Sequence, residues 1–151
     1  MIARPYPLEE DASIPMRPEV RARGWVLLVE DDDDLRRLTA AVLRGEGYEV
    51  DEAANGVGML RRIESALWGE TSDRYDVIIA DVLLPDLTAF EVLEALRSRK
   101  LDTPVILVTA YGGDEAREDA SALGAFALLD KPLDWDALRN VIWKAIHRGP
   151  R

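Results

Sequence analysis

The sequence contains no cysteine and a single histidine, His147, and these two shortages narrow its chemistry. Without cysteine, disulfide scaffolds, zinc ribbons, iron–sulfur clusters and thiol nucleophiles are excluded. One histidine argues against a histidine-based metal site or a Ser-His-Asp triad. No apolar run approaches the ~20 residues of a membrane span, and the N-terminus lacks the apolar core of a signal peptide. We therefore expect a soluble, cytoplasmic globular protein with no membrane contact.

The charge is strongly unbalanced, with 29 acidic side chains against 19 basic ones and a net charge of −10. This excess argues against direct binding of nucleic acid, because neutralising phosphates requires a basic face. The length of 151 residues, 48% of them hydrophobic, suits one domain with a real core.

Residues 1–24 differ from the rest, since they hold four of the eight prolines and their charges cancel. We expect a disordered leader there, or alternatively a docking tail for a partner. The folded domain is expected over 25–148, followed by a short tail at 149–151. The whole acidic excess then belongs to the folded domain.

From Trp25 onward, short apolar runs alternate with amphipathic stretches. Three runs are continuously apolar, which is typical of strands buried on both faces of a parallel sheet. The predicted strands are Trp25–Val29, Tyr48–Ala53, Asp76–Ala80, Pro104–Val108 and Ala125–Leu129. The predicted helix stripes are Leu35/Leu38/Val42, Leu60/Ile63/Leu67, Phe90/Leu93/Leu96, Ala116/Ala120/Leu123 and Leu138/Ile142 with Ala145 or Ile146. We expect Asp134 to cap the last helix and Gly69–Tyr75 to form a surface excursion. This order predicts an α/β fold, a (βα)5 doubly wound, five-stranded parallel sheet in three layers.

Polar side chains follow four of the predicted strands: Glu30 and Asp31 the first, Asp81 the third, Thr109 the fourth and Lys131 the fifth. Ligands of open parallel sheets bind outside the carboxyl ends of the strands. Clustered carboxylates repel one another and favour a hard cation such as Mg²⁺. A carboxylate can also accept a phosphoryl group as an aspartyl phosphate, with a lysine and a hydroxyl as charge and donor.

Each of these residues also has a simpler interpretation. The acidic run at 30–34 could be the solvated start of a helix, and we prefer that interpretation for Asp33 and Asp34. Lys131 could lie on the surface, but the chain has only three lysines against sixteen arginines, and this one precedes a proline.

The residues 26–32, 75–86, 105–110 and 124–133 read VLLVEDD, YDVIIADVLLPD, VILVTA and GAFALLDKPL. In these stretches the chain resembles the receiver domain of response regulators, over about 25–148. The resemblance implies a flavodoxin-like fold. It also implies that the chain accepts a phosphoryl group, with Mg²⁺, from a sensor histidine kinase or a phosphotransfer protein. Such a chain is a signalling module and not an enzyme with an external product.

Carried over by position, the resemblance makes Asp81 the phospho-acceptor and Asp31 a direct metal ligand. Glu30 would act mainly through a bound water, and the backbone carbonyl of Leu83 would complete the protein ligands. Lys131 would contact the phosphoryl oxygens. Thr109 would move toward the phosphate and report its presence.

Several positions depart from the family. Ala89 stands where glycine is usual, which suggests a slightly different loop. Leu128 replaces an aromatic switch residue, so either output uses another element or switching is weak. Tyr111 is our candidate substitute, whereas Phe126 is expected in the core. Because Leu83 and Tyr111 offer no group to orient an attacking water, we expect slow self-dephosphorylation.

The fourth helix has few apolar residues, which predicts low local stability and suits a surface that changes on phosphorylation. We expect an unidentified downstream protein to bind the face made by the fourth helix, fifth strand and fifth helix. Helices four and five could also form a homodimer. Trp135 and Trp143 of the last helix are each either core or partner-facing.

Three alternatives remain. The chain could be an interaction scaffold that uses phosphorylation weakly. It could be the receiver portion of a longer transcriptional regulator or hybrid kinase. An Mg²⁺ phosphatase is less favoured, because Leu83 stands where a second acid would be needed.

Overall fold

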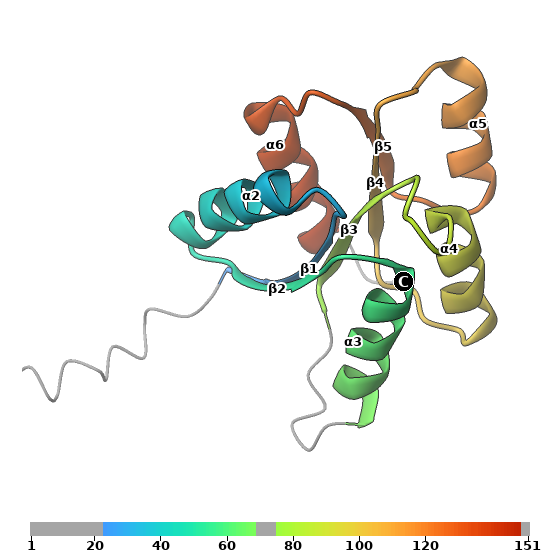
Figure 1. Cartoon of the computed structure of the whole chain (residues 1–151), viewed down its shortest axis with the longest axis horizontal. Coiled ribbons are helices and arrows are strands. Elements are labelled where there is room, and N and C mark those ends of the chain that lie inside the picture. Colours follow the sequence, from blue (N-terminus) through green and yellow to red (C-terminus); the bar gives the residue numbers. More distant parts are fainter. Residues whose placement is uncertain (1–22, 69–74, 149–151) are drawn as a thin grey trace, which may run out of the picture.

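The computed structural model describes residues 23–68 and 75–148, in which five strands alternate with five helices (Figure 1). The elements are β1 (Trp25–Val29), α2 (Asp33–Gly45), β2 (Glu49–Ala53), α3 (Gly56–Trp68), β3 (Val77–Asp81), α4 (Ala89–Ser98), β4 (Val105–Thr109), α5 (Asp114–Ala122), β5 (Ala127–Asp130) and α6 (Trp135–Ile146). Most of the predicted leader, nearly all of the predicted excursion at 69–75, and the tail at 149–151 lie outside the described residues.

The five strands form one parallel sheet in the order β2-β1-β3-β4-β5, which confirms the predicted fold class. The chain order reverses between β1 and β3, so the connections leave these neighbouring strands in opposite directions. In doubly wound sheets this reversal opens a crevice at the carboxyl ends of the two strands. The predicted polar residues lie at this edge of the sheet.

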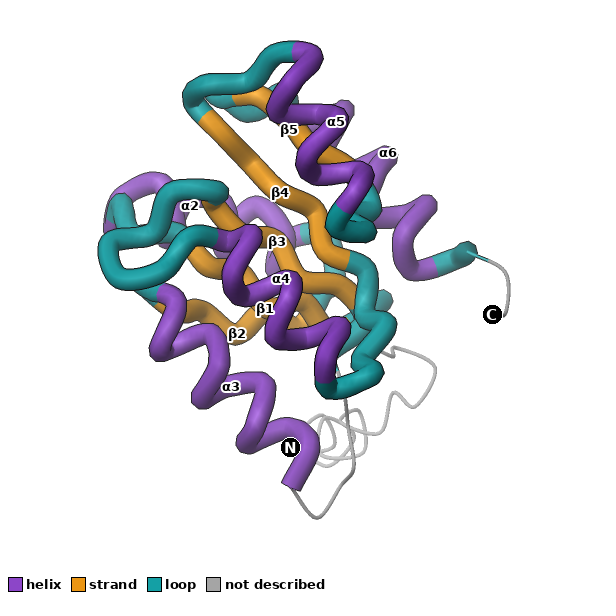
Figure 2. The backbone as a smooth tube through the Cα atoms, turned by 90° about the vertical axis from the view of Figure 1, so that its right-hand side faces the viewer, coloured by secondary structure: helices purple, strands orange, loops and turns teal. Residues whose placement is uncertain are grey.

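The two faces of the sheet are buried by different helices, which explains the continuously apolar strands. Val26 and Leu28 of β1 pack in a cluster with α2 and α6, whereas Leu27 and Val29 pack in a cluster with α3 and α4. Figure 1 shows α2 and α6 on one side of the sheet, and Figure 2 shows α3, α4 and α5 in front of it. Every residue of β3 and β4 is buried, as expected for central strands.

The strand limits differ from the prediction by one or two residues. The third and fourth strands run to Asp81 and Thr109, so these residues end their strands instead of following them. The fifth begins at Ala127, two residues later than predicted. Apolar composition located the centre of each strand, while hydrogen bonding to the neighbouring strands sets its ends.

The buried face of α2 was predicted incorrectly. Leu38 is 53% exposed, and the residues that face the sheet are Thr39, Ala40 and Leu43. The helix begins where Asp32 accepts a hydrogen bond from the amide of Leu35 at 3.1 Å. Asp33 and Asp34 occupy the first turn, which confirms them as a helix start.

Phe126 was expected in the core, and this prediction is wrong, because its side chain is 37% exposed. It precedes β5, an edge strand, and the neighbouring helix α5 carries only one buried residue, Ala120. A helix with so few apolar side chains leaves the ring uncovered. Leu128 is more buried, because it packs against the core.

The last two helices differ in how they are held. Asp134 caps α6, as predicted, by accepting from the amides of Asp136 and Ala137. By contrast, α5 starts at Asp114, and the residue before it, Gly113, provides no side-chain cap. Trp135 packs against the core, whereas Trp143 is 50% exposed and stacks on His147.

Within residues 23–68 and 75–148, no helix combines the length and apolarity that crossing a bilayer requires.

Ala89, which stands where the family usually has glycine, is the first residue of α4. Its amide donates to the carbonyl of Val82 at 2.9 Å, and its methyl group is buried. Among the described residues, Lys100 is the only non-glycine residue with a positive φ. The turn after Asp81 therefore does not need the conformational freedom of glycine at position 89.

We expect the substitution Ala89→Gly to lower the free energy of unfolding by about 1 kcal/mol, through added backbone freedom and a lost buried methyl group. Urea unfolding followed by circular dichroism measures this change. A variant as stable as the parent would show that position 89 is under glycine-like backbone strain.

Candidate functional site at the carboxyl edge of the sheet

The sheet topology brings the predicted acids together. β1 and β3 are neighbours in register, with Val29 beside Ala80, so the next residues, Glu30 and Asp81, lie side by side. Carboxylate oxygens of Glu30, Asp31 and Asp81 all lie within 4.8 Å of one another. Glu30 and Asp81 are only 5% and 8% exposed, whereas Asp31 faces solvent. The pocket thus has two buried carboxylates at its base and a third at its mouth.

Lys131 supplies the positive charge of this pocket. Its Nζ lies 2.6 Å from Oδ2 of Asp81 and 2.9 Å from Oε1 of Glu30. Its backbone amide donates to the carbonyl of Thr109 at 2.8 Å, which fixes the turn after β5. The side chain therefore points inward, and the alternative of a surface lysine is wrong.

Burial and pairing shift the pKa values of these groups in understandable directions. Burial raises the pKa of the Glu30 carboxyl, and the hydrogen bonds from Lys131 and from the amide of Asp32 only partly offset this. Burial opposes the charge on Lys131, but hydrogen bonds to Asp81 and Glu30 outweigh it and raise the pKa of the ammonium group. Lys131 is thus charged at neutral pH.

Backbone amides also hold the two buried carboxylates. The amide of Asp32 donates to Oε2 of Glu30 at 3.1 Å, and the amide of Leu83 donates to Oδ1 of Asp81 at 3.0 Å. In each case the donor lies two residues after the acid, so the local turn orients the side chain. One oxygen of each carboxylate faces an amide and the other faces Lys131.

Thr109 is buried at the end of β4, and its Oγ1 accepts a hydrogen bond from the amide of Tyr111 at 3.0 Å. The side chains of Tyr111 and Leu83 are 76% and 56% exposed, and the amide of each donates to a site residue two positions earlier. Leu128 lies farther away, in a groove of about 230 Å³ between α5 and β5 that Phe126 also lines.

Three further contacts in this region were missed by sequence reasoning. Asp86 accepts hydrogen bonds from the amides of Gly56 and Val57 at 2.8 and 2.9 Å, which ties the loop after β3 to α3. These amide bonds lower the pKa of the Asp86 carboxyl. Arg117 pairs with Asp130 at 2.9 Å beside the site. No spacing rule pairs residues this far apart in the sequence.

Arg36 is the third missed residue, and it touches the site directly. Its Nη1 donates to the backbone carbonyl of Glu30 at 2.9 Å. The available signal was an arginine two residues after an acidic run, but on sequence alone it reads as an i,i+3 partner of Asp33.

The donor set fits a hard divalent cation. Three carboxylates provide only oxygen ligands, and Mg²⁺ prefers oxygen, with one or two carboxylates and several waters. Two of the acids are buried beside a single ammonium group, so the pocket carries uncompensated negative charge. The residues present are therefore compatible with Mg²⁺.

Comparisons with known proteins agree with this site. Residues 26–143 match the family model of the response regulator receiver domain. Sporulation initiation phosphotransferase F of Bacillus subtilis is 30% identical over 119 residues, which are 79% of this chain and 90% of that protein. The regulatory protein AtoC of Escherichia coli is 32% identical over 121 residues, which are 80% of this chain but 25% of AtoC. The chain thus spans most of one relative and about a quarter of the other.

Solved structures show the same flavodoxin-like fold. The receiver domain of the Francisella response regulator 1452 superposes with a TM-score of 0.75 at 25% identity, covering 83% of this chain and 98% of that one. The chemotaxis response regulator CheY4 of Vibrio cholerae gives 0.69 at 31% identity, with 81% and 98% covered. The chain therefore belongs to the response regulator receiver domains of two-component systems, signalling modules that kinases phosphorylate on an aspartate.

Proposed function

We propose that Asp81 is the aspartate that receives the phosphoryl group. The main support for this proposal is the distance of 2.6 Å between the Nζ of Lys131 and Oδ2 of Asp81. This contact places the ammonium group beside the nucleophilic carboxylate. Asp81 also lies at the carboxyl end of a central strand, at the reversal of chain order where doubly wound sheets bind ligands. Its burial excludes most water from the acceptor.

The chemistry assigned to this chain is a single transfer. An oxygen of Asp81 bonds to phosphorus while the bond from phosphorus to the donor breaks, giving an aspartyl phosphate. Lys131 stabilises the phosphoryl oxygens as they approach the buried carboxylate. Receiver domains generally bind Mg²⁺ at an acidic cluster, and when bound the ion supplies further positive charge to those oxygens. Glu30, Asp31, Asp81 and the carbonyl of Leu83 would hold it here.

The signal passes to Thr109, according to this proposal. Its Oγ1 accepts from the amide of Tyr111, and a rotation of the side chain that moves Oγ1 to a phosphoryl oxygen would break that bond. The loop that carries Tyr111 leads into α5, which has one buried residue and no side-chain cap. This helix therefore offers little resistance to rearrangement.

Two kinds of partner protein are proposed, a phosphoryl donor and a downstream target. Receiver domains interact with histidine kinases or phosphotransfer proteins, and we propose such a protein in the cytoplasm as the donor. A downstream protein would dock on the face of α5, β5 and α6, where Phe126 and Trp143 are exposed. The same face could support a homodimer. In this proposal the chain catalyses only its own phosphorylation and dephosphorylation, either as a separate receiver or as the receiver portion of a longer regulator.

The second candidate is a receiver-fold scaffold that is phosphorylated weakly. One observation favours it, since Leu128 has no aromatic ring to change position when Thr109 moves. The complete set around Asp81 supports the first candidate.

Phosphorylation should depend on Asp81. With Mg²⁺ and a small phosphodonor, we expect the intact mass of the parent chain to increase by one phosphoryl group and that of Asp81→Asn to remain unchanged. Asp86→Asn is the matched control, because it changes a nearby aspartate that caps α3 and leaves the pocket intact. A parent chain that gains no phosphate would contradict the proposal.

Mg²⁺ affinity should decrease on acidification, beginning at a higher pH than for an exposed glutamate. The folded-state pKa of Glu30 is raised, so this carboxylate takes up a proton early and loses the charge that attracts the ion. Isothermal titration calorimetry across a pH series measures the affinity. Glu30→Gln should bind Mg²⁺ more weakly at neutral pH, and its Mg²⁺ affinity should change less with pH. The same pH dependence in both proteins would show that protonation of Glu30 does not control Mg²⁺ binding.

Once formed, the aspartyl phosphate should persist well beyond seconds at neutral pH. Leu83 and Tyr111 border the site with side chains that cannot orient an attacking water. Loss of the added mass after donor removal gives the rate. We expect Leu83→Gln to accelerate it and Leu38→Gln, an equally exposed leucine on α2, to leave it unchanged. Decay of the parent phospho-form within seconds would show that another group activates water.

A further inference from the structure

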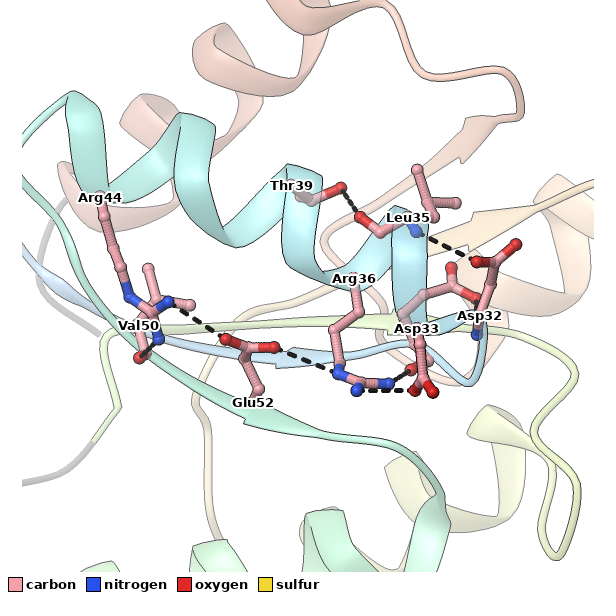
Figure 3. A network of polar contacts seen from close by, with 9 residues as sticks. Asp32, Asp33, Leu35, Arg36, Thr39, Arg44, Val50 and Glu52 are labelled. Carbon is pink, nitrogen blue, oxygen red and sulfur yellow. Dashed lines mark hydrogen bonds and ion pairs between the residues drawn. The ribbon is translucent and has the colours of Figure 1, made fainter.

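Arg36 lies in the first turns of α2, and its guanidinium is almost enclosed by polar partners. The side chain is 12% exposed. Nη1 donates to the carbonyl of Glu30 at 2.9 Å, Nη2 lies 2.8 Å from Oδ1 of Asp33, and Nε donates to Oε1 of Glu52 at 3.2 Å. Figure 3 shows this network between α2 and the strands beneath it. Each of the three nitrogens of this fork thus has a separate acceptor.

The carbonyl that Arg36 binds belongs to the peptide between Glu30 and Asp31. Because a peptide unit is planar, holding this oxygen fixes the plane that joins the two acids. The amide of Glu30 donates to the carbonyl of Ala53 on β2 at 3.1 Å. Arg36 therefore acts where β1 ends and the turn that carries both carboxylates begins.

Glu52 connects this contact to the sheet. It lies on β2, paired in register with Leu28, and its side chain is 25% exposed. Its second oxygen binds Arg44 at 3.1 Å, about two turns farther along the same side of α2 (Figure 3). Glu52 thus holds Arg36 from a hydrogen-bonded strand, whereas Asp33, the other carboxylate partner, is 63% exposed and contributes less.

We propose that Arg36 is a positioning residue for the metal-binding carboxylates. It holds the peptide between Glu30 and Asp31 in the orientation that lets both side chains reach one divalent cation. This inference rests on the proposed function, since it concerns the same pocket. Replacing a residue that orients the metal ligands without binding the metal itself typically weakens metal affinity tenfold or more.

The sign of the effect separates positioning from simple charge. A guanidinium near the pocket repels a divalent cation, so removing it should by charge alone strengthen Mg²⁺ binding. Positioning predicts the opposite, because a loosened peptide must be ordered again when the ion binds. Arg36→Lys keeps the charge but cannot bridge the three acceptors in this fixed fork.

The experiment compares Mg²⁺ affinity by isothermal titration calorimetry in the full chain and in three variants. We expect Arg36→Met to raise the Kd about tenfold and Arg36→Lys to raise it by a smaller factor. Arg44→Met is the matched control, because it removes the same charge and frees the same Glu52 without touching Glu30. Its Kd should stay at the parent value, and thermal unfolding of all four proteins shows how much stability each loses.

Phosphorylation by a small donor gives a second measurement. The Mg²⁺ concentration for half-maximal rate should rise in both Arg36 variants, while the rate at saturating Mg²⁺ remains near that of the parent. A general loss of stability would not raise the Mg²⁺ requirement while leaving the rate at saturating Mg²⁺ unchanged. If Arg36→Met does not fold, Arg36→Lys still allows the test.

Three results would overturn the inference. Unchanged or tighter Mg²⁺ binding in the Arg36 variants refutes positioning while leaving the proposed function intact. An equal loss of affinity in Arg44→Met assigns the effect to general stability. A parent chain that binds no Mg²⁺ refutes both this inference and the proposed metal site.

Discussion

Two buried carboxylates, Glu30 and Asp81, share a single ammonium group, and the site depends on this arrangement. Two like charges 4 Å apart repel by about 4 kcal/mol at an effective dielectric constant of 20, so the pocket is unstable without a cation. Lys131 provides one such cation, through ion pairs with both carboxylates. A divalent ion bound beside it would reduce the remaining excess of negative charge. Under the proposed function the phosphoryl oxygens need the same ammonium group, so Lys131 would both neutralise the two carboxylates and bind the transferred group.

The chain holds the two sides of this pocket with different rigidity. On the side of β1, the start of α2 is capped by Asp32, and Arg36 ties the turn to β2 through Glu52. On the side of β4, the loop leads into α5, which has one buried residue and no side-chain cap. A rigid half suits ion binding, which needs preorganised ligands. A weakly packed half suits a surface that must change shape.

Sequence reasoning located the fold and the pocket because both follow from periodicity and topology. Continuously apolar runs marked the central strands, and the rule that parallel strands end at one edge brought Glu30, Asp81 and Lys131 together. It failed where a neighbouring element decides the outcome. Phe126 is exposed because α5 does not cover it, and Arg36 contacts Glu30 because α2 folds back over β1. Such contacts depend on how elements pack, which spacing along one element does not encode.

Leu128 has no aromatic ring that could change position on phosphorylation, so a change at the site would have to reach α5 through the backbone. Thr109 is connected to the next loop by a hydrogen bond from the amide of Tyr111 to Oγ1, in which the side chain at position 128 takes no part. If Thr109 moves toward a phosphoryl group as proposed, its Oγ1 shifts away from that amide and the loop before α5 loses one restraint. The groove of about 230 Å³ between α5 and β5, which Phe126 lines, would then change shape with the helix. Under the proposed function, switching would therefore depend on movement of α5 and not on an aromatic ring at position 128.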